Sequence, residues 1–427
     1  MSSLLIQGGR VISPADGLDG PFDLLLEDGL IREIGPQGGR RADRIIDARA
    51  QVVAPGFVDP HVHLREPGGE ESETLETGLA AAVTGGFTSV CPMPNTSPVN
   101  DRPEAIRFLI ERAGKLGLAR VFPIAAVSLR SEGEVLTDFR ALVAAGAVAF
   151  SDDGRPVKTA ALMKTAMEAA RELGVPVIEH CEDPSLSAGG VVNEGAVAEK
   201  LGVKGVPAAS EEVCLARDLV LAEATGAHLH VAHLSTAGSV DLVRAARRRG
   251  VRVTAEVTPH HFVLTDEAVL QRGANAKMNP PLRSARDLDE VLAGLADGTI
   301  DAIATDHAPH ASRLKAKPLS EAPFGVIGLE TALGLAMTFL VHSGRISVRD
   351  LVTLLSVNPA CIINQPLGRL TAGSPADVTI FDPEREWVYG VEESRSKSRN
   401  SPFDGWKLRG CVTATIVAGK VVYERAG

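Results

Sequence analysis

Histidine and aspartate residues recur in this sequence at the ends of short apolar segments. His61 and His63 are two apart, and side chains at that spacing on an extended chain share one face. Two imidazoles on one face can bind one metal ion, although an HxH pair alone is a weak motif. His180, His233 and Asp306 end three later apolar segments. Four histidines and a carboxylate, without thiolate, favour zinc, with manganese or cobalt as substitutes.

Carboxylates give this predicted metal site two further functions. Asp306 can bind a metal ion and accept a proton from metal-bound water. A helix N-cap at Asp306 is the alternative, but His307 and His310 follow in what reads as a loop. The histidines suit two divalent ions, which need a bridging ligand, and Asp152 or Asp153 is available. Because side chains alternate along a strand, only one of the two points inward, and the choice stays open.

The middle of the chain alternates short apolar segments with helix-length amphipathic segments. We expect strands at 52–58, 88–93, 120–127, 147–151, 176–179, 228–233, 252–257 and 301–305. We expect helices at 73–84, 103–113, 160–173, 210–225, 237–248 and 285–296. This alternation implies a parallel sheet, and eight strands close a (β/α)₈ TIM-like barrel whose strand ends meet at one rim. A doubly wound open sheet is disfavoured because no glycine-rich phosphate loop follows the first strand.

Both ends of the chain differ from the middle, because they read as short strands separated by Gly, Pro and Asp turns. The expected strands are 3–7, 22–27, 30–34, 44–47, 377–381, 411–417 and 420–423. We therefore predict an α/β protein in which residues 1–55 and 365–427 form one small composite β-sandwich domain. Residues 56–364 form the catalytic barrel.

Composition limits the partners of the protein. The 427 residues carry a formal charge of −10, with acids and bases interspersed, which argues against a nucleic-acid-binding face. The N-terminus lacks signal-peptide features, and no stretch reads as a membrane span. The 5 cysteines are dispersed, as in a reduced cytosolic chain with mostly buried thiols. We expect a cytoplasmic enzyme with a small-molecule substrate, and base rates favour a homodimer.

Several stretches resemble a known family. They are PGFVDPHVHLREPG (55–68), PMPNTSPV (92–99), FSDDGRPV (150–157), EHCED (179–183), HVAHLST (230–236), EVTPHH (256–261), KMNPPLR (277–283), ATDHAPH (304–310) and the C-terminal SPADVTIFD and SRNSPFDGWKLRG. Over nearly the whole chain the sequence resembles the amidohydrolase superfamily and, within it, the bacterial type I dihydroorotases. The resemblance implies metal-dependent, reversible hydrolysis of (S)-dihydroorotate to N-carbamoyl-L-aspartate in pyrimidine (UMP) biosynthesis.

The resemblance also implies a function for each matching position of the metal site, with one or two zinc ions per subunit. By this likeness His61 and His63 bind the more buried ion, and His180 and His233 bind the second. Asp153 bridges the ions. Asp306 is both a metal ligand and the general base.

The same resemblance implies how the substrate is held. Arg65, Asn95 and His310 would hold the substrate carboxylate, with His63 beside them, and Asn279 and the backbone of Phe324 and Gly325 would lie near the ring. Arg65 also follows from its chemistry, because a guanidinium two residues beyond His63 can pair bidentately with a carboxylate. A surface arginine paired with Glu66 is the alternative.

One departure from the wider superfamily favours the narrower family. Many relatives, including hydantoinases and allantoinases, bridge their ions with a carboxylated lysine, whereas this chain has Asp152 and Asp153, with Lys158 beyond the strand end. Type I dihydroorotases also have aspartate there, and the number of tightly held ions stays open. A hydantoinase or allantoinase is one alternative. A non-catalytic partner of aspartate transcarbamoylase is another, and association with that enzyme follows from family analogy only.

Two further expectations concern the surroundings of the site. His260 and His261 are interpreted as support for the metal ligands rather than as ligands. Residues 309–325 form either a lid over the barrel mouth or an ordinary surface loop. We assign no function to His228, His230 and His342.

Overall fold

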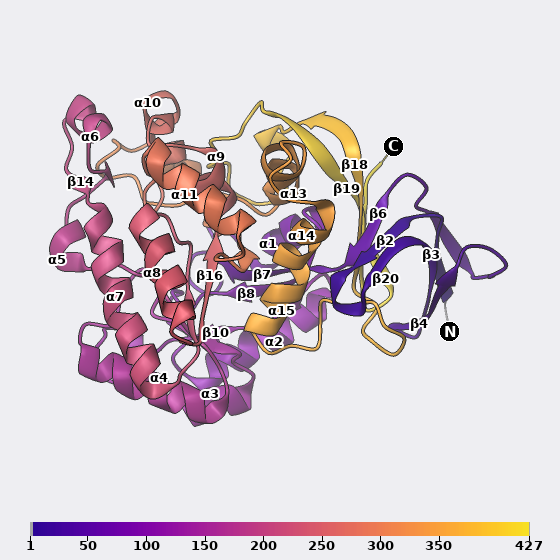
Figure 1. Cartoon of the computed structure of the whole chain (residues 1–427), viewed down its shortest axis with the longest axis horizontal. Helices are drawn as coiled ribbons and strands as arrows, with labels where there is room; N and C mark the ends of the chain where they lie inside the picture. Colours follow the sequence, from indigo (N-terminus) through magenta and orange to yellow (C-terminus); the bar gives the residue numbers. More distant parts are fainter. Residues whose placement is uncertain (1–2, 427) are drawn as a thin grey trace.

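A computed structural model describes residues 3–426, and its centre is a closed barrel of parallel strands (Figure 1). The barrel strands are β7 (Phe57–Val62), β8 (Phe87–Pro92), β9 (Arg120–Val121), β10 (Ile124–Ala125), β11 (Ala149–Phe150), β12 (Val177–Glu179), β15 (Leu229–Val231), β16 (Val253–Val257) and β17 (Ala302–Ile303). The expected strand 120–127 is therefore two short strands, β9 and β10, which occupy one position in the barrel. A parallel bridge from Val62 to His307 closes the last strand onto the first, which confirms the barrel.

Helices cover the outside of this barrel. The longer ones are α1 (Leu75–Thr84), α2 (Pro103–Leu116), α3 (Phe139–Ala145), α4 (Ala160–Leu173), α7 (Ala208–Thr225), α8 (Ala237–Arg248) and α11 (Ala285–Ala296). In α4 the buried residues are Met163, Ala166, Met167 and Ala170, which form one stripe at helical spacing. The Thr159 side chain caps the first turn of α4 by accepting from Leu162 N, and Gly174 ends the helix at φ 71°.

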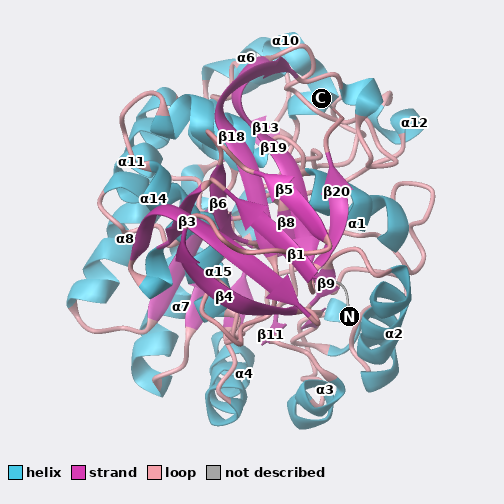
Figure 2. Ribbon diagram, turned by 90° about the vertical axis from the view of Figure 1, so that its right-hand side faces the viewer, coloured by secondary structure: helices cyan, strands magenta, loops and turns pink. Residues whose placement is uncertain are grey.

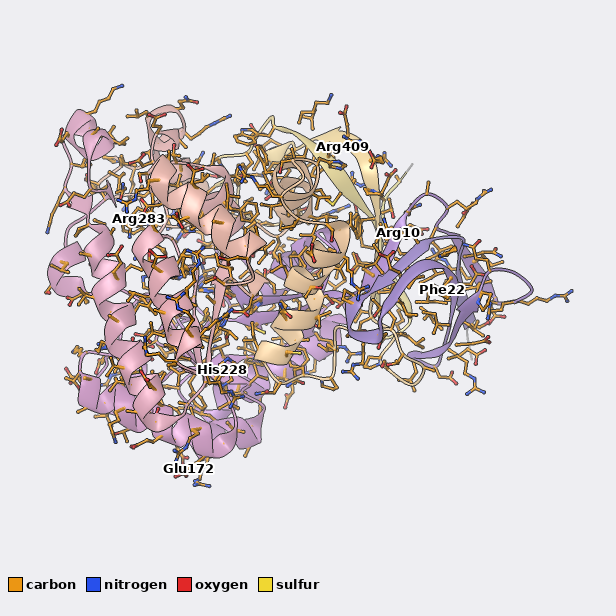
Figure 3. The ribbon with its side chains drawn as sticks, viewed as in Figure 1. Arg10, Phe22, Glu172, His228, Arg283 and Arg409 are labelled. Carbon is orange, nitrogen blue, oxygen red and sulfur yellow. The ribbon has the colours of Figure 1, made fainter. Side chains whose placement is uncertain are left out.

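Shorter elements lie in the loops and beyond the last barrel strand. They are α5 (Pro184–Ser187), α6 (Ala196–Leu201), α9 (Pro259–Val263), α10 (Ala268–Arg272), α12 (Ser312–Lys315), α13 (Ala332–Ala336), α14 (Val348–Val352), α15 (Asn358–Ile362), and the paired strands β13 (Val192–Asn193) and β14 (Gly205–Val206). Arg283, labelled in Figure 3, is buried and fastens this pair to the loop after β15. It donates to Val206 O at 2.8 Å and to Ser235 Oγ at 3.1 Å.

A second sheet lies beside the barrel and is built from both ends of the chain (Figures 1 and 2). Its strands are β1 (Ser3–Gln7), β2 (Arg10–Ser13), β3 (Leu18–Glu27), β4 (Leu30–Pro36), β5 (Arg44–Asp47), β6 (Val52–Pro55), β18 (Val378–Val388), β19 (Lys407–Val417) and β20 (Lys420–Glu424). Their order is β20-β19-β18-β6-β2-β3-β1-β5, with β4 on β3. The expected separate sheet of terminal strands is therefore present, whereas the boundaries at 55 and 365 stay a prediction.

The expected single strand at 52–58 is wrong, because the structure divides it. β6 pairs with β18 and β2 in the terminal sheet, whereas β7 pairs with β8 in the barrel. Gly56 separates them, and a Cβ there would lie 2.1 Å from Thr88 Oγ1, so the close approach requires glycine. One continuous apolar run thus serves two sheets, a division that hydrophobicity alone does not reveal.

Small and medium apolar side chains fill the interior of the barrel below its rim. They include Val58, Cys91, Ile124, Ala149, Ile178, Ala232 and Ala302, which form one buried cluster. The barrel is therefore a packed core, and chemistry is confined to its mouth. Among residues 3–426 no helix is long and apolar enough to cross a membrane.

Candidate active site

The six residues predicted to bind metal meet at the rim formed by the carboxyl ends of the barrel strands. His61 lies on β7, and the other five lie in the loops that follow β7, β11, β12, β15 and β17. All six are buried: His61, His63, Asp153, His180, His233 and Asp306. The barrel brings together residues that are more than 240 positions apart, because all strand ends point to one face.

The six side chains form two adjacent groups. In the first, His63 Nε2 lies 3.0 Å from Asp306 Oδ1, and His61 Nε2 lies 3.7 Å from the same oxygen. In the second, His180 Nδ1 lies 3.0 Å from His233 Nε2, and these nitrogens lie 3.5 and 3.7 Å from Asp153 Oδ1. Each group offers imidazole nitrogens and a carboxylate oxygen at one point.

Asp153 lies between the two groups, and its neighbour Asp152 does not. Asp153 Oδ1 is 3.5 Å from His61 Nε2, and Oδ2 is 3.6 Å from His63 Nε2. The Asp152 carboxylate accepts hydrogen bonds from the backbone N and the hydroxyl of Ser128 instead. Strand alternation left both aspartates possible, and of the two only Asp153 lies between the two histidine groups, as the resemblance implied.

Two buried atoms at this point lack a hydrogen-bond partner among the described residues. They are His61 Nε2 and Asp153 Oδ1, which face each other across the 3.5 Å gap. Unpaired buried polar atoms are rare because they lose hydration without replacing it. An imidazole nitrogen and a carboxylate oxygen aimed at one point fit a divalent cation, and a nitrogen and oxygen donor set suits zinc.

The charges of the site also favour a cation. Burial raises the pKa of Asp306, but the hydrogen bond from His63 and the nearby histidine charges outweigh it and hold that pKa well below its usual range. Burial lowers the pKa of His61, yet Asp153 and Glu256 outweigh it and raise that pKa to about 9. The carboxylates therefore keep their negative charge and hold positive partners close.

Two glutamates that the sequence analysis did not single out support the histidines from behind. Glu256, at the end of β16, accepts from His61 Nδ1 at 2.8 Å and from His230 Nε2 at 3.0 Å. Glu182 Oε2 lies 3.0 Å from His180 Nε2. A carboxylate on one ring nitrogen fixes the direction of the other. Glu256 begins the stretch EVTPHH and Glu182 lies within EHCED, so the family motifs contained a signal for both.

His260 and His261, predicted to support the metal ligands, do not contact those ligands by hydrogen bonds in residues 3–426. His261 Nδ1 lies 2.8 Å from Thr258 Oγ1, and its Nε2 lies 3.0 Å from Pro280 O. Neither histidine forms a hydrogen bond to a candidate metal ligand in residues 3–426. Their contribution to the metal site stays a prediction, whereas His230, given no function from sequence, contacts the site through Glu256.

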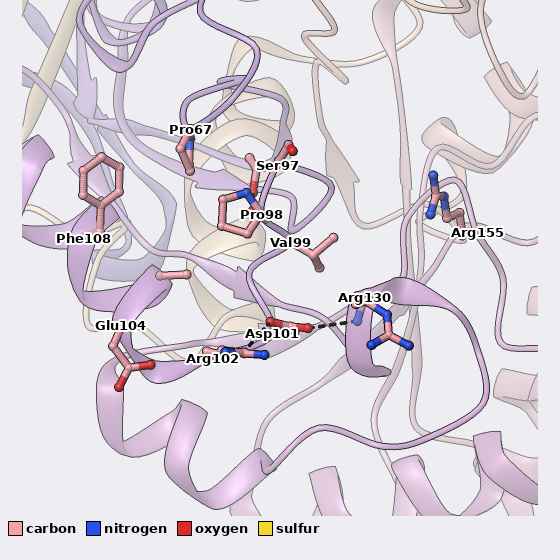
Figure 4. Close-up of a pocket in the computed structure, with 12 residues that line it drawn as sticks. Pro67, Ser97, Pro98, Val99, Asp101, Arg102, Glu104, Phe108, Arg130 and Arg155 are labelled. Carbon is pink, nitrogen blue, oxygen red and sulfur yellow. Dashed lines mark hydrogen bonds and ion pairs between the residues drawn. The ribbon is translucent and has the colours of Figure 1, made fainter.

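A cavity of about 530 Å³ opens above the metal ligands. The predicted substrate contacts line it together with several of those ligands: His63, Arg65, Asn95, Asn279, His310, Phe324 and Gly325. A larger cavity of about 950 Å³ lies beside the start of α2, lined by Pro67, Pro98 and Phe108 (Figure 4). It contains no candidate metal ligand, so size alone does not identify the active site.

Arg65 is half-buried in the substrate cavity and is not paired with Glu66, so that alternative is wrong. Arg65 Nε donates to Pro309 O at 3.1 Å, and the Glu66 carboxylate accepts from Leu75 N. Within residues 3–426 the guanidinium forms no ion pair with a carboxylate. Its charge is therefore free to bind an anionic substrate group.

Two other predicted carboxylate contacts are already engaged within the protein. Asn95 Oδ1 lies 2.9 Å from His63 Nδ1, and its Nδ2 donates to Asp153 Oδ2 at 3.0 Å. Asn95 thus links two metal-ligand candidates. His310 Nε2 lies 2.7 Å from Phe324 O, so this nitrogen must carry the hydrogen. Burial and the charge of Arg65 lower the pKa of His310 to about 3, which keeps the ring neutral.

The (β/α)₈ barrel and its rim of histidines and aspartates place the chain in the class of TIM-barrel amidohydrolases. Solved structures agree: an L-hydantoinase (dihydropyrimidinase) from Arthrobacter aurescens matches with a TM-score of 0.89 and 27% identity, covering 100% of this chain and 97% of its own. A D-hydantoinase from a Thermus species matches with a TM-score of 0.82 and 28% identity, covering 99% and 97%.

Sequence relatives define the family more narrowly. The chain is 50% identical to a dihydroorotase of Syntrophus aciditrophicus over 99% of both chains. It is 51% identical to a dihydroorotase of Pelotomaculum thermopropionicum, over 99% of this chain and 98% of the relative. A family model described as Dihydro-orotase-like matches residues 50–239. The chain belongs to the dihydroorotase family, and its amidohydrolase relatives are metal-dependent enzymes.

Proposed function

We propose that this protein catalyses the reversible hydrolysis of the ring amide of (S)-dihydroorotate to N-carbamoyl-L-aspartate, a step of pyrimidine biosynthesis. One observation carries the proposal: an unpaired guanidinium, Arg65, shares a cavity of about 530 Å³ with a cluster of histidines and aspartates. The cavity combines a receptor for an anionic group with a hydrolytic metal site. The relatives at about 50% identity that are named dihydroorotase support the same substrate.

We propose zinc as the metal, with one or two ions per subunit. His61, His63 and Asp306 would hold one ion, His180 and His233 the second, and Asp153 would lie between them. Bound divalent ions supply a Lewis acid that polarises the amide carbonyl and activates water. The orphaned His61 Nε2 and Asp153 Oδ1 support a cation here.

Asp306 is proposed as the general base. When water attacks the ring carbonyl carbon, the Asp306 carboxylate accepts a proton from that water. The bond from the carbonyl carbon to the ring nitrogen then breaks, and Asp306 returns the proton to the departing nitrogen. Ring closure follows the same steps in reverse. Asp306 Oδ1 lies 3.0 Å from His63 Nε2, so a metal ion bound by both side chains would fix this carboxylate in place.

Arg65 is proposed to select the substrate. Its guanidinium can form two parallel hydrogen bonds to the exocyclic carboxylate of dihydroorotate. Asn279, Phe324 and Gly325 also line this cavity and would contact the ring. Allantoin has no such carboxylate, so a cavity with a free arginine favours dihydroorotate over that alternative substrate.

The direct test is a substrate comparison on the metal-loaded protein. We expect turnover of dihydroorotate to exceed that of hydantoin and allantoin by at least about a hundredfold in kcat/KM, because only dihydroorotate engages Arg65. Preference for hydantoin or allantoin would overturn the proposed substrate. Absence of all turnover, despite bound metal, would favour the non-catalytic alternative, which is disfavoured because all six candidate ligands are present.

The cellular setting is also proposed. We propose a cytoplasmic homodimer, and family analogy adds association with aspartate transcarbamoylase. Of the 5 cysteines, 4 are buried and none forms a disulfide, as in a reducing compartment. Sedimentation of the protein alone and with aspartate transcarbamoylase measures both associations. A monomer at micromolar concentration that does not co-sediment would contradict both.

A further inference from the structure

Lys315, on α12, is a buried lysine that contacts backbone carbonyls rather than carboxylates. Its side chain is 7% exposed. Nζ donates to Gly325 O at 2.8 Å, to Pro323 O at 3.0 Å and to Lys277 O at 3.3 Å. In the described part of the chain it forms no ion pair. A buried ammonium without a counter-charge is costly, so three good acceptors here indicate a built feature.

Lys277 contacts other carbonyl groups of the same segment. Its Nζ donates to Leu319 O and to Ala322 O, both at 2.6 Å, and lies 4.3 Å from the centre of the Phe324 ring. Gly325 N in turn donates to Lys277 O at 2.9 Å. The two ammonium groups together fasten five carbonyls, and we call this pair of residues the lysine clamp.

The lysine clamp holds the part of the substrate-cavity wall that is formed by backbone atoms. Phe324 and Gly325 line the cavity, and Phe324 O lies 2.7 Å from His310 Nε2. Asn279, two residues after Lys277, lines the same cavity. The clamp therefore fixes the positions of the ring contacts and of His310 without itself lining the cavity.

We propose that Lys315, assisted by Lys277, is a positioning residue for the anionic cyclic substrate. This inference rests on the proposed function. Lys315 keeps the Phe324–Gly325 backbone in its binding position. Its uncompensated charge behind His310 also favours the substrate carboxylate. Substrate binding and retention of the Lys315 charge therefore favour each other.

The pH dependence of this effect has a defined sign. Burial, with the charge of Lys277, lowers the pKa of Lys315 to about 7. Below that pH the ammonium supplies three donor hydrogens and a positive charge, and above it one donor hydrogen and the charge are lost. Substrate affinity should therefore fall as the pH rises above about 7.

The other charged groups around Lys315 do not supply this titration. His310 is neutral because its pKa is about 3. Lys315 also lines a second cavity with Arg272, Glu392 and Arg399, where Glu392 pairs with Arg399 at 3.4 Å. No carboxylate among the described residues forms an ion pair with the Lys315 ammonium, so a substrate carboxylate would add a negative charge that the protein does not supply.

The test compares Lys315→Met, Lys277→Met and the control Lys317→Met, whose side chain is exposed two residues along the chain. We expect Lys315→Met to raise KM for dihydroorotate by about tenfold, with kcat changed by less than about threefold and metal content unchanged. Lys277→Met should act in the same direction. Lys317→Met should match the parent protein.

A pH profile separates positioning from a loss of general stability. In the parent protein KM for dihydroorotate should rise above about pH 7, whereas in Lys315→Met it should be high and flat. An unchanged KM in both clamp variants, or an unaltered pH profile in Lys315→Met, would overturn the proposed positioning role of the lysine clamp. If Lys315→Met does not fold, Lys277→Met alone decides. Absent turnover by the parent protein would instead refute the proposed function, so the two failures are distinguishable.

Discussion

The two walls of the candidate active site are built in opposite ways. One wall consists of side chains at strand ends, the histidines and aspartates, whose positions follow from the closed barrel. The other wall consists of loop residues, Arg65, His310 and the Phe324–Gly325 backbone. The first is held by the sheet, and the second depends on side chains that bind carbonyl groups.

The charges behind the two walls also differ in sign. Carboxylates stand behind the histidines, with Glu256 against His61 and Glu182 against His180. Ammonium groups stand behind the loop wall, where Lys315 and Lys277 hold its carbonyls. Each wall is thus backed by charge complementary to what it would bind, a metal cation or a substrate carboxylate. The sign of the charge behind each wall is therefore opposite to the sign of the ligand that the wall would bind.

The largest expected effect belongs to the histidine and aspartate wall. Asp306→Ala removes the proposed general base and a metal contact, so we expect turnover to fall at least about ten-thousandfold. Circular dichroism should show an intact fold. Near-normal dihydroorotate turnover by this variant would remove Asp306 from the mechanism.

Asp153 and Asp152 offer a matched pair on the same wall. Asp153→Ala should lower zinc content and reduce turnover on the order of a thousandfold, because it removes the oxygen between the two histidine groups. Asp152→Ala should keep the metal but destabilise the protein by about 1–3 kcal/mol, since Ser128 loses its acceptor. Zinc analysis and urea unfolding of both variants measure this. Equal zinc loss in the two would contradict the bridging assignment.

Arg65 tests the loop wall. Arg65→Met should raise KM for dihydroorotate by about a hundredfold, because the substrate carboxylate loses its charged partner. Dihydrouracil, the same ring without the carboxylate, should be affected much less. Arg140→Met, an exposed arginine on α3, is the control. Equal losses on both substrates would exclude recognition of the carboxylate by Arg65.

The smallest expected effect concerns the charge behind the histidines. Glu256→Gln keeps the side-chain volume but removes the carboxylate charge that faces His61 Nδ1 and His230 Nε2. We expect zinc affinity to fall by about tenfold to a hundredfold, with turnover restored at saturating zinc. Competition with a chelator measures the affinity. Unchanged affinity would mean that Glu256 has only a structural function.

The sequence predicted the barrel and the meeting of the rim residues, because strand alternation and polar strand ends follow from local patterns. Strand alternation did not choose between Asp152 and Asp153, because the choice depends on Ser128 in another loop, and only the family resemblance indicated Asp153. It also merged β6 and β7 into one strand at 52–58, although the predicted domain boundary fell at residue 55, because their separation depends on the close approach of Gly56 to Thr88. Glu256 and Lys315 were missed because each acts through contacts that only the fold creates. Glu182 lies two residues from His180 within the motif EHCED, so its signal was local and was not recognised.

We propose that the histidine and aspartate wall and Arg65 together form the active site of a metal-dependent dihydroorotase. The most direct measurement is the rate of dihydroorotate hydrolysis on samples whose zinc content is measured in parallel, from metal-free protein to saturation. We expect the metal-free protein to be inactive and activity to rise with bound zinc up to one or two ions per chain. Full activity in metal-free protein, or zinc-saturated protein without activity on dihydroorotate, would contradict it.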